Sequence, residues 1–545
     1  MNPLTTDDRA ALDADEVEQQ IYLIGDDVPL PDKASSSTFG AKAWNLARMD
    51  VLGLPVPPAF VLGTRWCQQP EAVHQFWPEA LTRLEKVTGL GLGDPRRPLL
   101  LSVRSGAPVS MPGMMETLLN IGLTETTLPG MVRLTGHPRL TWDAFRRLIA
   151  GYGEIVAGIE AFHFEADLDA VRQTNDEREL DFASLREIAR RHLATYAREA
   201  GEPFPQDARV QLRDAITAVF ASWHGSKARA YRELHGLSHD MGTAVTVQRM
   251  VFGNAGGLSG SGVGFTRHPS SGDPLPWVDF LFNAQGEDVV SGRRSAQGHE
   301  ELATVAPYLW ENLKQVCTQL EQAFGDMQDV EFTVQDRQLY LLQTRNGKRT
   351  PQAIARIALD LWEEGVIDAA TALDRTSHLD ARALTLRRVA SANGDPLSPL
   401  ARAATASSGV ACGEIVLDED RARARKSAGA QVILVRRDAE THDIAALELA
   451  DGLLTQRGAR TSHAAVVARQ LGKVCLVGCT AMTVDEQART LSIGERQLVE
   501  GDILTLDANE GTIHLGETRI VEQVHEALLE RLARLREMAA EHQHV

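Results

Sequence analysis

The sequence predicts an α/β protein made of several domains. The chain has 545 residues, more than one hydrophobic core usually holds, so roughly three or four domains are expected. Strand-like apolar runs at 99–104 and 244–252 alternate with a long segment, 141–235, whose apolar spacing is helical. Hydrophobic residues make up 43% of the chain and charged residues 24%, which is the composition of an ordinary globular protein.

Breaker-rich segments divide the chain into five expected parts. The clearest linker is 391–399, where Gly, Pro, Asn and Ser cluster. The amphipathic tail at 519–545 is expected to pack on the protein rather than to dock a partner. The expected parts are a lead-in at 1–35, a large mixed domain at 36–350, a helical linker at 351–399, a compact domain of short strands with one central helix (463–471) at 400–516, and a C-terminal helix at 517–545.

The charge and cysteine content argue against several classes of protein. The formal net charge is −18, which disfavours a general nucleic-acid or membrane-surface binder. The N-terminus lacks the features of a signal peptide, and no apolar run approaches the ~20 residues that cross a bilayer. The five cysteines are scattered, and the close pair Cys475 and Cys479 lacks a second pair to complete a zinc site. We expect buried free thiols and a cytoplasmic protein.

A single histidine, His463, is the strongest candidate for chemistry. It opens a short apolar helix after a strand at 451–455 and a turn at Gly458, and Thr461 or Ser462 could cap that helix. Free N–H groups and the helix dipole at such an end favour an added anion. An imidazole, with an unperturbed pKa of ~6.5, is mostly neutral and nucleophilic at pH 7. The local pattern fits a phosphoryl acceptor, and fits equally a capped helix with an incidental histidine.

A glycine-rich segment at 253–264 has six glycines in twelve residues. Such a backbone can approach a polyphosphate closely and direct N–H groups at it. The segment lies between two expected strands, which favours a phosphate-covering hairpin over a P-loop. Gly260, Ser261 and Gly262 are the expected nucleotide contacts within it.

Three basic residues lie beside glycines or at strand ends, where a cation can reach a pocket. These are Lys42, Arg104 and Arg345. Taken singly, each is more often a member of a surface ion pair. Together with the glycine-rich segment they fit a nucleotide-phosphate site.

Two carboxylates, Asp329 and Glu331, are separated by one residue in an expected strand, and Gln343 follows. Alternation along a strand places both carboxylates on one face. That spacing suits a Mg²⁺ ion held between protein and phosphate oxygens. The three clusters together predict ATP as a substrate and Mg²⁺ as a cofactor.

Four long motifs resemble the pyruvate, phosphate dikinase family. They span 102–115, 282–290, 343–349 and 458–469, and the resemblance runs in order from about residue 36 to 516. It implies an ATP-grasp nucleotide-binding domain with a helical insertion at about 141–235. A swivelling β/β/α phosphohistidine domain is expected to follow.

The resemblance also assigns roles to individual residues. His463 matches the histidine that becomes phosphorylated, and Arg345 matches a catalytic contact to the phosphates. Thr461 matches a site of regulatory phosphorylation in plant dikinases, and we do not extend that regulation to this chain. The matching nucleotide and metal contacts are Lys42, Arg104, Glu287, Gln343, Glu331 and Asp329.

The sequence departs from the family pattern at two places. Gly257 and Leu258 stand where two aspartates are common, which changes the charge of the glycine-rich segment. Ala459 and Arg460 replace a usual Gly-Met before the histidine, and the arginine resembles phosphoenolpyruvate synthases. Whether inorganic phosphate or water takes the second phosphoryl group therefore stays open.

The phosphoryl acceptor is the least determined part of the expected function. The family's dikinases continue into a barrel that binds pyruvate and phosphoenolpyruvate, and this sequence has no recognisable counterpart. We expect pyruvate to be held by a separate barrel subunit. One alternative is the same ATP-dependent phosphotransferase acting on a phenol, antibiotic or glycan hydroxyl, although 351–399 is too short for an inserted acceptor domain. Another is a non-catalytic ATP sensor, against which the intact site residues argue.

Overall fold

The computed structural model describes residues 21–542, with gaps at 27–28, 32–33, 110, 112–113, 173–179, 291–297, 391–396, 440–442, 459 and 461–462. The chain divides into two compact units. The first contains residues 1–257 and 340–344, and the second contains 258–339 and 345–545. The large domain expected at 36–350 therefore contributes to both units.

The first unit is built on one antiparallel sheet in the order β1-β2-β5-β3-β4. The expected strands at 99–104 and 244–252 are present as β3 and β5, with slightly shifted ends. The expected lead-in is partly wrong, because residues 21–24 pair with β2 as an edge strand. The strands are β1 (Ile21–Ile24), β2 (Ala59–Leu62), β3 (Leu101–Gly106), β4 (Thr117–Ile121) and β5 (Ala244–Arg249).

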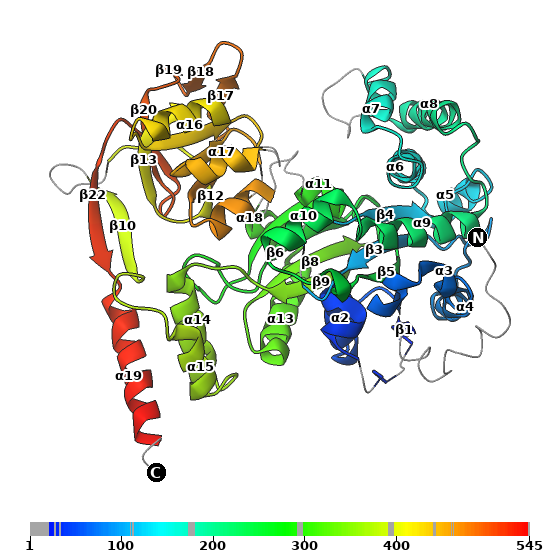
Figure 1. Ribbon diagram of the computed structural model, residues 1–545, viewed down its shortest axis with the longest axis horizontal. Helices are drawn as coiled ribbons and strands as arrows, with labels where there is room; N and C mark the ends of the chain where they lie inside the picture. The colour runs from blue at the N-terminus through cyan, green and yellow to red at the C-terminus, as the bar shows by residue number, and fades with distance from the viewer. Residues whose placement is uncertain are drawn as a thin grey trace. The chain divides into compact units, whose positions relative to one another are not determined.

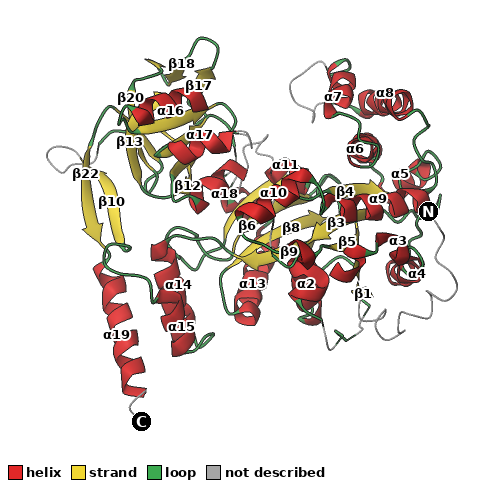
Figure 2. Cartoon of the chain, in the orientation of Figure 1, coloured by secondary structure: helices red, strands yellow, loops and turns green. Residues whose placement is uncertain are grey.

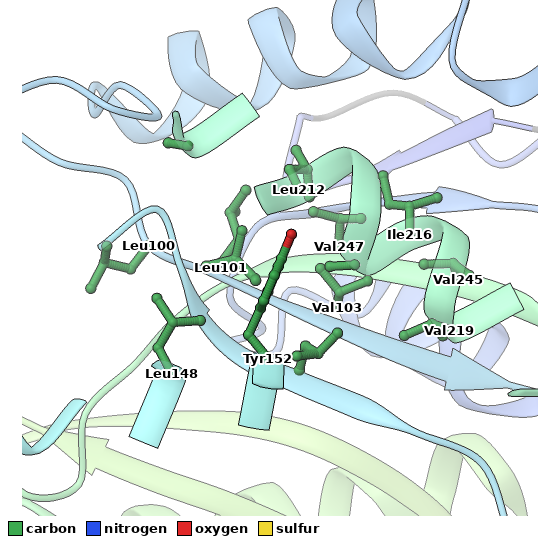
Figure 3. Packing of buried hydrophobic residues seen from close by; sticks show 14 of the residues in the cluster. Leu100, Leu101, Val103, Leu148, Tyr152, Leu212, Ile216, Val219, Val245 and Val247 are labelled. Atoms are coloured by element: carbon green, nitrogen blue, oxygen red, sulfur yellow. The ribbon is translucent and has the colours of Figure 1, made fainter. Parts of the chain in front are cut away.

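Helices cover this sheet and confirm the helical segment predicted at 141–235. Figure 3 shows Tyr152 of α6 among Leu212, Ile216 and Val219 of α9 and the valines of β3 and β5. The Tyr152 hydroxyl donates to Asp214 at 2.8 Å, so the buried ring keeps a hydrogen-bond partner. The longer helices are α2 (Ser36–Val51), α4 (Trp77–Thr88), α5 (Leu128–Thr135), α6 (Pro138–Ile155), α7 (Ala161–Asp169), α8 (Phe182–Ala200), α9 (Ala208–Ser222) and α10 (Ser226–Leu234).

The second unit begins with a four-stranded sheet in the order β7-β6-β8-β9. Three helices accompany it, and α13 contacts β8. Residues 340–344 of β9 group with the first unit, so this strand belongs to both units. The elements are β6 (Gly260–Phe265), β7 (Trp277–Phe282), β8 (Gln328–Gln335), β9 (Gln338–Asn346), α11 (Gly286–Val290), α12 (His299–Val305) and α13 (Pro307–Phe324).

Strand β6 corrects the predicted extent of the glycine-rich loop. Gly260, Ser261 and Gly262 are buried in the strand, with ladder partners on both sides. A Cβ at Gly262 would lie 2.3 Å from the Phe332 ring, and one at Gly260 would lie 2.2 Å from the Phe280 ring. The rings of Phe280 and Phe332 are stacked with centroids 5.9 Å apart. These glycines make room for aromatic packing, and the loop itself ends at about Ser259.

An eight-stranded sheet forms the centre of the domain expected at 400–516, in the order β11-β21-β20-β13-β14-β15-β16-β12. Buried apolar side chains pack on both faces of this sheet. A small antiparallel sheet, β17-β18-β19, is formed by the residues between β16 and β20. The strands are β11 (Ala401–Arg402), β12 (Ala404–Ser407), β13 (Val410–Val416), β14 (Val432–Arg436), β15 (Gly452–Thr455), β16 (Val474–Val477), β17 (Met482–Asp485), β18 (Thr490–Ile493), β19 (Arg496–Val499), β20 (Ile503–Asp507) and β21 (Thr512–Leu515).

The expectation of one central helix in this domain is wrong, because its described residues contain three helices; Figure 2 draws helices in red. Strands β13 to β16 are parallel neighbours, and parallel neighbours need crossover connections. Helices α16 (Glu419–Ser427), α17 (Ile444–Leu449) and α18 (His463–Gln470) supply the three crossovers. The sequence of α16, Glu-Asp-Arg-Ala-Arg-Ala-Arg-Lys-Ser, has little apolar periodicity, which explains why the pattern did not reveal it.

The connections on either side of this domain are paired with each other. Strands β10 (Thr385–Ala390) and β22 (Arg519–Val524) form a six-residue antiparallel ribbon. The predictions of helix at 385–390 and at 519–524 are therefore wrong, because each strand gains ladder partners that local sequence does not reveal. Of the predicted linker, residues 391–396 lie outside the described residues.

The C-terminal helix packs as expected. Leu528, Leu532 and Leu535 of α19 (Glu526–His542) are buried against α14 (Pro351–Glu363) and α15 (Ala369–Thr376), which lie beside it in Figure 1. The Arg531 guanidinium adds ion pairs to α14. The apolar face of this helix is thus used within the chain.

The cysteines are free thiols. Four of the five are buried and Cys412 is half-buried, so the expectation of buried thiols holds for all but that one. Burial raises the pKa of Cys475 to about 12, which keeps it an inert thiol. Among the described residues, no helix combines the length and apolar character needed to cross a bilayer.

We predict that Gly262→Ala destabilises the second unit, because its new Cβ would overlap the Phe332 ring. Overpacking of this kind typically costs ~1–3 kcal/mol. Scanning calorimetry should show a lower melting temperature. Gly286→Ala is the control, since nothing lies within 4 Å of a Cβ at that position. Equal melting temperatures for Gly262→Ala and the wild type would contradict the packing role.

Candidate functional site

The predicted basic residues of the first unit lie close to one another. Helix α2 has a non-helical residue, Gly40, with φ 73°, and a Cβ there would lie 1.8 Å from the Gly106 carbonyl oxygen. Only glycine permits this approach. It brings Lys42 against β3, because a Cβ at Gly106 would lie 3.6 Å from the Cβ of Lys42. Arg104 lies two residues before Gly106 on the same strand.

The glutamine predicted at the triphosphate belongs to the same group. Arg104 donates from Nη1 to the Leu342 carbonyl at 3.3 Å, and Leu342 precedes Gln343. The side chain of Asn45 donates to the Thr344 carbonyl at 2.8 Å. Residues 342–344 are therefore held by β3 and α2. The first unit thus places Lys42 and Arg104 close together and beside the segment that carries Gln343.

The second unit carries the predicted carboxylates and Arg345. In β8, Asp329 and Glu331 are the half-buried positions between fully buried ones, as the predicted alternation requires. Arg345 Nε donates to Asp329 Oδ2 at 2.8 Å. Burial raises the pKa of Asp329, and the neighbouring Arg345 opposes that shift. Burial alone would lower the pKa of Arg345, but Asp329 and then Glu331 raise it, so the guanidinium stays charged.

This cluster fits a magnesium ion that also binds phosphate. The two carboxylates supply hard oxygen ligands on one face of β8. Among the described residues, no three His, Cys, Asp or Glu side chains converge as a complete metal cage. Mg²⁺ commonly takes one or two carboxylates and completes its octahedron with phosphate oxygens and water. The geometry therefore suits a metal–nucleotide complex better than a metal bound by protein alone.

Two predicted residues are only partly described. Glu287 lies in the short helix α11, and His463 is the first residue of α18, but the side chains of both lie outside the described residues. The predicted caps, Thr461 and Ser462, also lie outside them. The helix itself is well anchored, because Ala464, Ala465 and Ala468 are buried against the sheet.

Sequence reasoning singled out Arg460 but missed its partners near the start of α18. Arg460 forms an ion pair with Asp279 of β7 at 2.8 Å, and Arg469 is buried near Trp277. Burial lowers the pKa of the nearby His268 to about 4, so this imidazole is neutral at pH 7. The sequence feature that could have revealed these contacts is the single aspartate in the apolar run Trp-Val-Asp-Phe-Leu-Phe of β7.

Two family models match the chain. The model described as "Pyruvate phosphate dikinase, AMP/ATP-binding domain" matches residues 70–300 and 299–365. The model described as "PEP-utilising enzyme, mobile domain" matches residues 429–511. The first match covers the strands that carry Asp329, Glu331 and Arg345, and the second covers His463. The mixed α/β multidomain architecture agrees with an ATP-grasp domain followed by a phosphohistidine domain.

Curated relatives agree with these matches. Pyruvate, phosphate dikinase of Clostridium symbiosum is 41% identical over 484 residues, covering 85% of this chain and 54% of the relative. Pyruvate, phosphate dikinase 1 of Arabidopsis thaliana, described as chloroplastic, is 39% identical over 498 residues, covering 89% and 51%. Pyruvate, phosphate dikinase 2 of Zea mays is 40% identical over 497 residues, covering 89% and 56%. The chain spans about half the length of these relatives. It belongs to the pyruvate, phosphate dikinase family.

Proposed function

We propose that this protein takes a phosphoryl group from ATP onto His463 and passes it to an acceptor, in the cytoplasm. The observation that carries the proposal is the Arg345–Asp329–Glu331 cluster on adjacent strands, within the segment that matches an AMP/ATP-binding domain. The match of 429–511 to a mobile domain supports His463 as the carrier. The names of the relatives support dikinase chemistry.

The proposed release of AMP determines which bonds form and break in the first step. An unprotonated nitrogen of His463 forms a bond to the β-phosphorus, and the bond from that phosphorus to the oxygen shared with the α-phosphate breaks. AMP leaves with the electron pair. The β- and γ-phosphates then reside on the histidine. The γ-phosphoryl group next passes to inorganic phosphate or to water, which leaves one phosphoryl group on His463.

The chain's own residues bind and orient the phosphates in this proposal. Arg345 stabilises charge on the transferring group, while Lys42, Arg104 and Gln343 fix the phosphate chain, with Glu287 as a further contact. Electrostatic stabilisation of this kind is usually the largest single catalytic contribution. When bound, Mg²⁺ neutralises charge on the phosphate oxygens, and Glu331 and Asp329 are the residues that would hold it.

The acceptor is proposed to be pyruvate, held on a barrel subunit separate from these 545 residues. Pyruvate appears in the names of the relatives. Those relatives extend to about twice the matched length, and the proposal assigns pyruvate binding to a part outside the match. The ribbon of β10 and β22 flanks the domain at 400–516 that carries His463, here called the histidine domain. This ribbon is the proposed pivot for movement of the domain between donor and acceptor.

His463→Asn should lose all labelling from ATP that carries isotope in its β-phosphate. The wild type should gain acid-labile, base-stable label, because a phosphohistidine has that stability. Autoradiography after acid and base treatment provides the measurement. His525→Asn is a suitable control, since this histidine directly precedes α19 and lies outside the proposed site. Label that persists in His463→Asn would place the carrier elsewhere.

Glu331→Gln and Arg345→Ala should each reduce AMP formation about 100-fold or more, because each removes a charge that faces the phosphates. Folding should be retained, as judged by circular dichroism, although Arg345→Ala should also lower the melting temperature because it removes the partner of Asp329. The matched controls are Glu311→Gln, on the surface of α13, and Arg382→Ala, an exposed arginine. Near-normal rates in Glu331→Gln or Arg345→Ala would move the ATP site away from this cluster.

The 545-residue chain alone should convert ATP to AMP stoichiometrically with His463 and then stop. Pyruvate alone should not discharge the loaded histidine, because the proposal places the site that orients pyruvate on another subunit, and orientation supplies effective molarities on the order of 10⁵ M or more. Adding a barrel subunit should restore repeated turnover in a coupled phosphoenolpyruvate assay. Discharge by a small hydroxyl compound would favour a different acceptor. ATP binding without AMP formation would favour a sensor.

A further inference from the structure

Arg460, three residues before His463, makes a set of contacts with strand β7. Its guanidinium pairs with Asp279 Oδ1 through Nε at 2.9 Å and through Nη2 at 2.8 Å. Nη2 also donates to the Val278 carbonyl at 3.1 Å. The same group lies over the Trp277 ring, 4.2 Å from its centroid. One side chain therefore makes ionic, hydrogen-bond and cation–π contacts with three successive residues of β7.

The partner carboxylate is almost completely buried, and this favours an arginine over a lysine as its partner. Asp279 is 1% exposed, while the Arg460 side chain retains 20% exposure. A buried carboxylate without a partner is strongly unfavourable. A planar guanidinium satisfies it and also stacks on an indole, which a lysine ammonium cannot do in the same way. The contact holds the described residue Arg460 against β7, which a loose surface pair would not do.

Arg469, in the last turn of α18, makes further contacts with the Arg460 backbone and with Trp277. It is 8% exposed and donates from Nε to the Ala406 carbonyl at 2.9 Å. Its Nη2 also reaches the Arg460 carbonyl at 3.4 Å. Its guanidinium lies 5.3 Å from the Phe265 ring centroid and 5.7 Å from that of Trp277. Two arginines of the histidine-bearing segment thus meet at one tryptophan.

Strand register places these contacts on the face that carries the proposed metal ligands. Asp279 pairs with Val263, which pairs on its other side with Glu331. Trp277 pairs with Phe265, which pairs with Asp329. Directly opposed residues share a face of the sheet. With strands about 4.8 Å apart, Asp279 lies roughly 10 Å from Glu331 across that face.

We infer that Arg460 is a positioning residue for phosphoryl transfer to His463. Through Asp279 and Trp277, it holds the start of α18 on the face of the sheet that bears Asp329 and Glu331. It acts through the backbone and need not contact the nucleotide. The inference rests on the proposed function, because it concerns the same transfer from ATP. It assigns a role to a residue at which this chain departs from the usual Gly-Met pattern.

Single-turnover phosphorylation of His463 tests the inference in the full-length chain. Arg460→Ala should slow phosphorylation at saturating ATP at least tenfold, because small misplacements of a reacting group cost rate steeply. The affinity for ATP, measured by calorimetry, should stay unchanged. Arg457→Ala is the matched control, since this exposed arginine of the same turn contacts only Asp438, at 3.9 Å, among the ion pairs of the described residues. Arg457→Ala should retain the wild-type rate.

A double-variant cycle and a structural readout separate positioning from general damage. Asp279→Asn combined with Arg460→Ala should be no slower than the slower single variant, because both changes break one contact. Arg460→Lys should recover only part of the rate, since it keeps the charge without the stacking. Hydrogen exchange should show reduced protection of β7 and the start of α18 in Arg460→Ala, with unchanged protection of β14.

The outcomes distinguish this inference from the proposed function. A wild-type rate in Arg460→Ala overturns the positioning role and leaves the proposed function intact. Additive losses in the double variant, or weaker ATP binding in Arg460→Ala, also overturn it. Failure of the wild type itself to label His463 overturns the proposed function, and the inference with it. A selective loss of rate, coupled to Asp279, supports the inference.

Discussion

The four-stranded sheet of the second unit, β7-β6-β8-β9, depends on the absence of side chains on one face of β6. Gly262 leaves room for the rings of Phe280 and Phe332 to stack across the strand. This packing sets β7 and β8 on either side of β6. The opposite face is then free to carry charged groups, which include Asp279, Asp329 and Glu331. The proposed site for anionic phosphates and a buried aromatic layer therefore lie on opposite faces of the same paired strands.

Two carboxylates on this charged face are each paired with an arginine. Arg345 neutralises Asp329, and Arg460 neutralises Asp279. Each pair lies where an isolated charge would be costly, so neither arginine is replaceable by an apolar residue without a penalty. The first pair belongs to strands of the sheet, while the second joins the sheet to the segment before His463. The same physical rule thus applies both to the proposed ATP site and to the segment before α18, which carries the proposed phosphoryl carrier His463.

The histidine domain is tied to the rest of its unit by paired elements. Strands β10 and β22 bring its two connections together, and the Val389 N–H donates to Asp507 of the domain at 3.0 Å. Helix α19 then buries its leucines against α14 and α15. A ribbon of two strands resists twisting more than a single flexible linker. Movement of the domain would therefore turn about a defined ribbon.

The sequence by itself determined the family motifs, the carboxylates on one face of β8 and the packing of the last helix, because two- and 3.6-residue periodicities are local properties. Tertiary structure alone decided the strand at 260–265, the ribbon at 385–390 and 519–524, and two crossover helices. It also decided the pairing of Arg460 with Asp279, which are 181 positions apart. Such contacts depend on which strands become neighbours, and no local pattern encodes that choice.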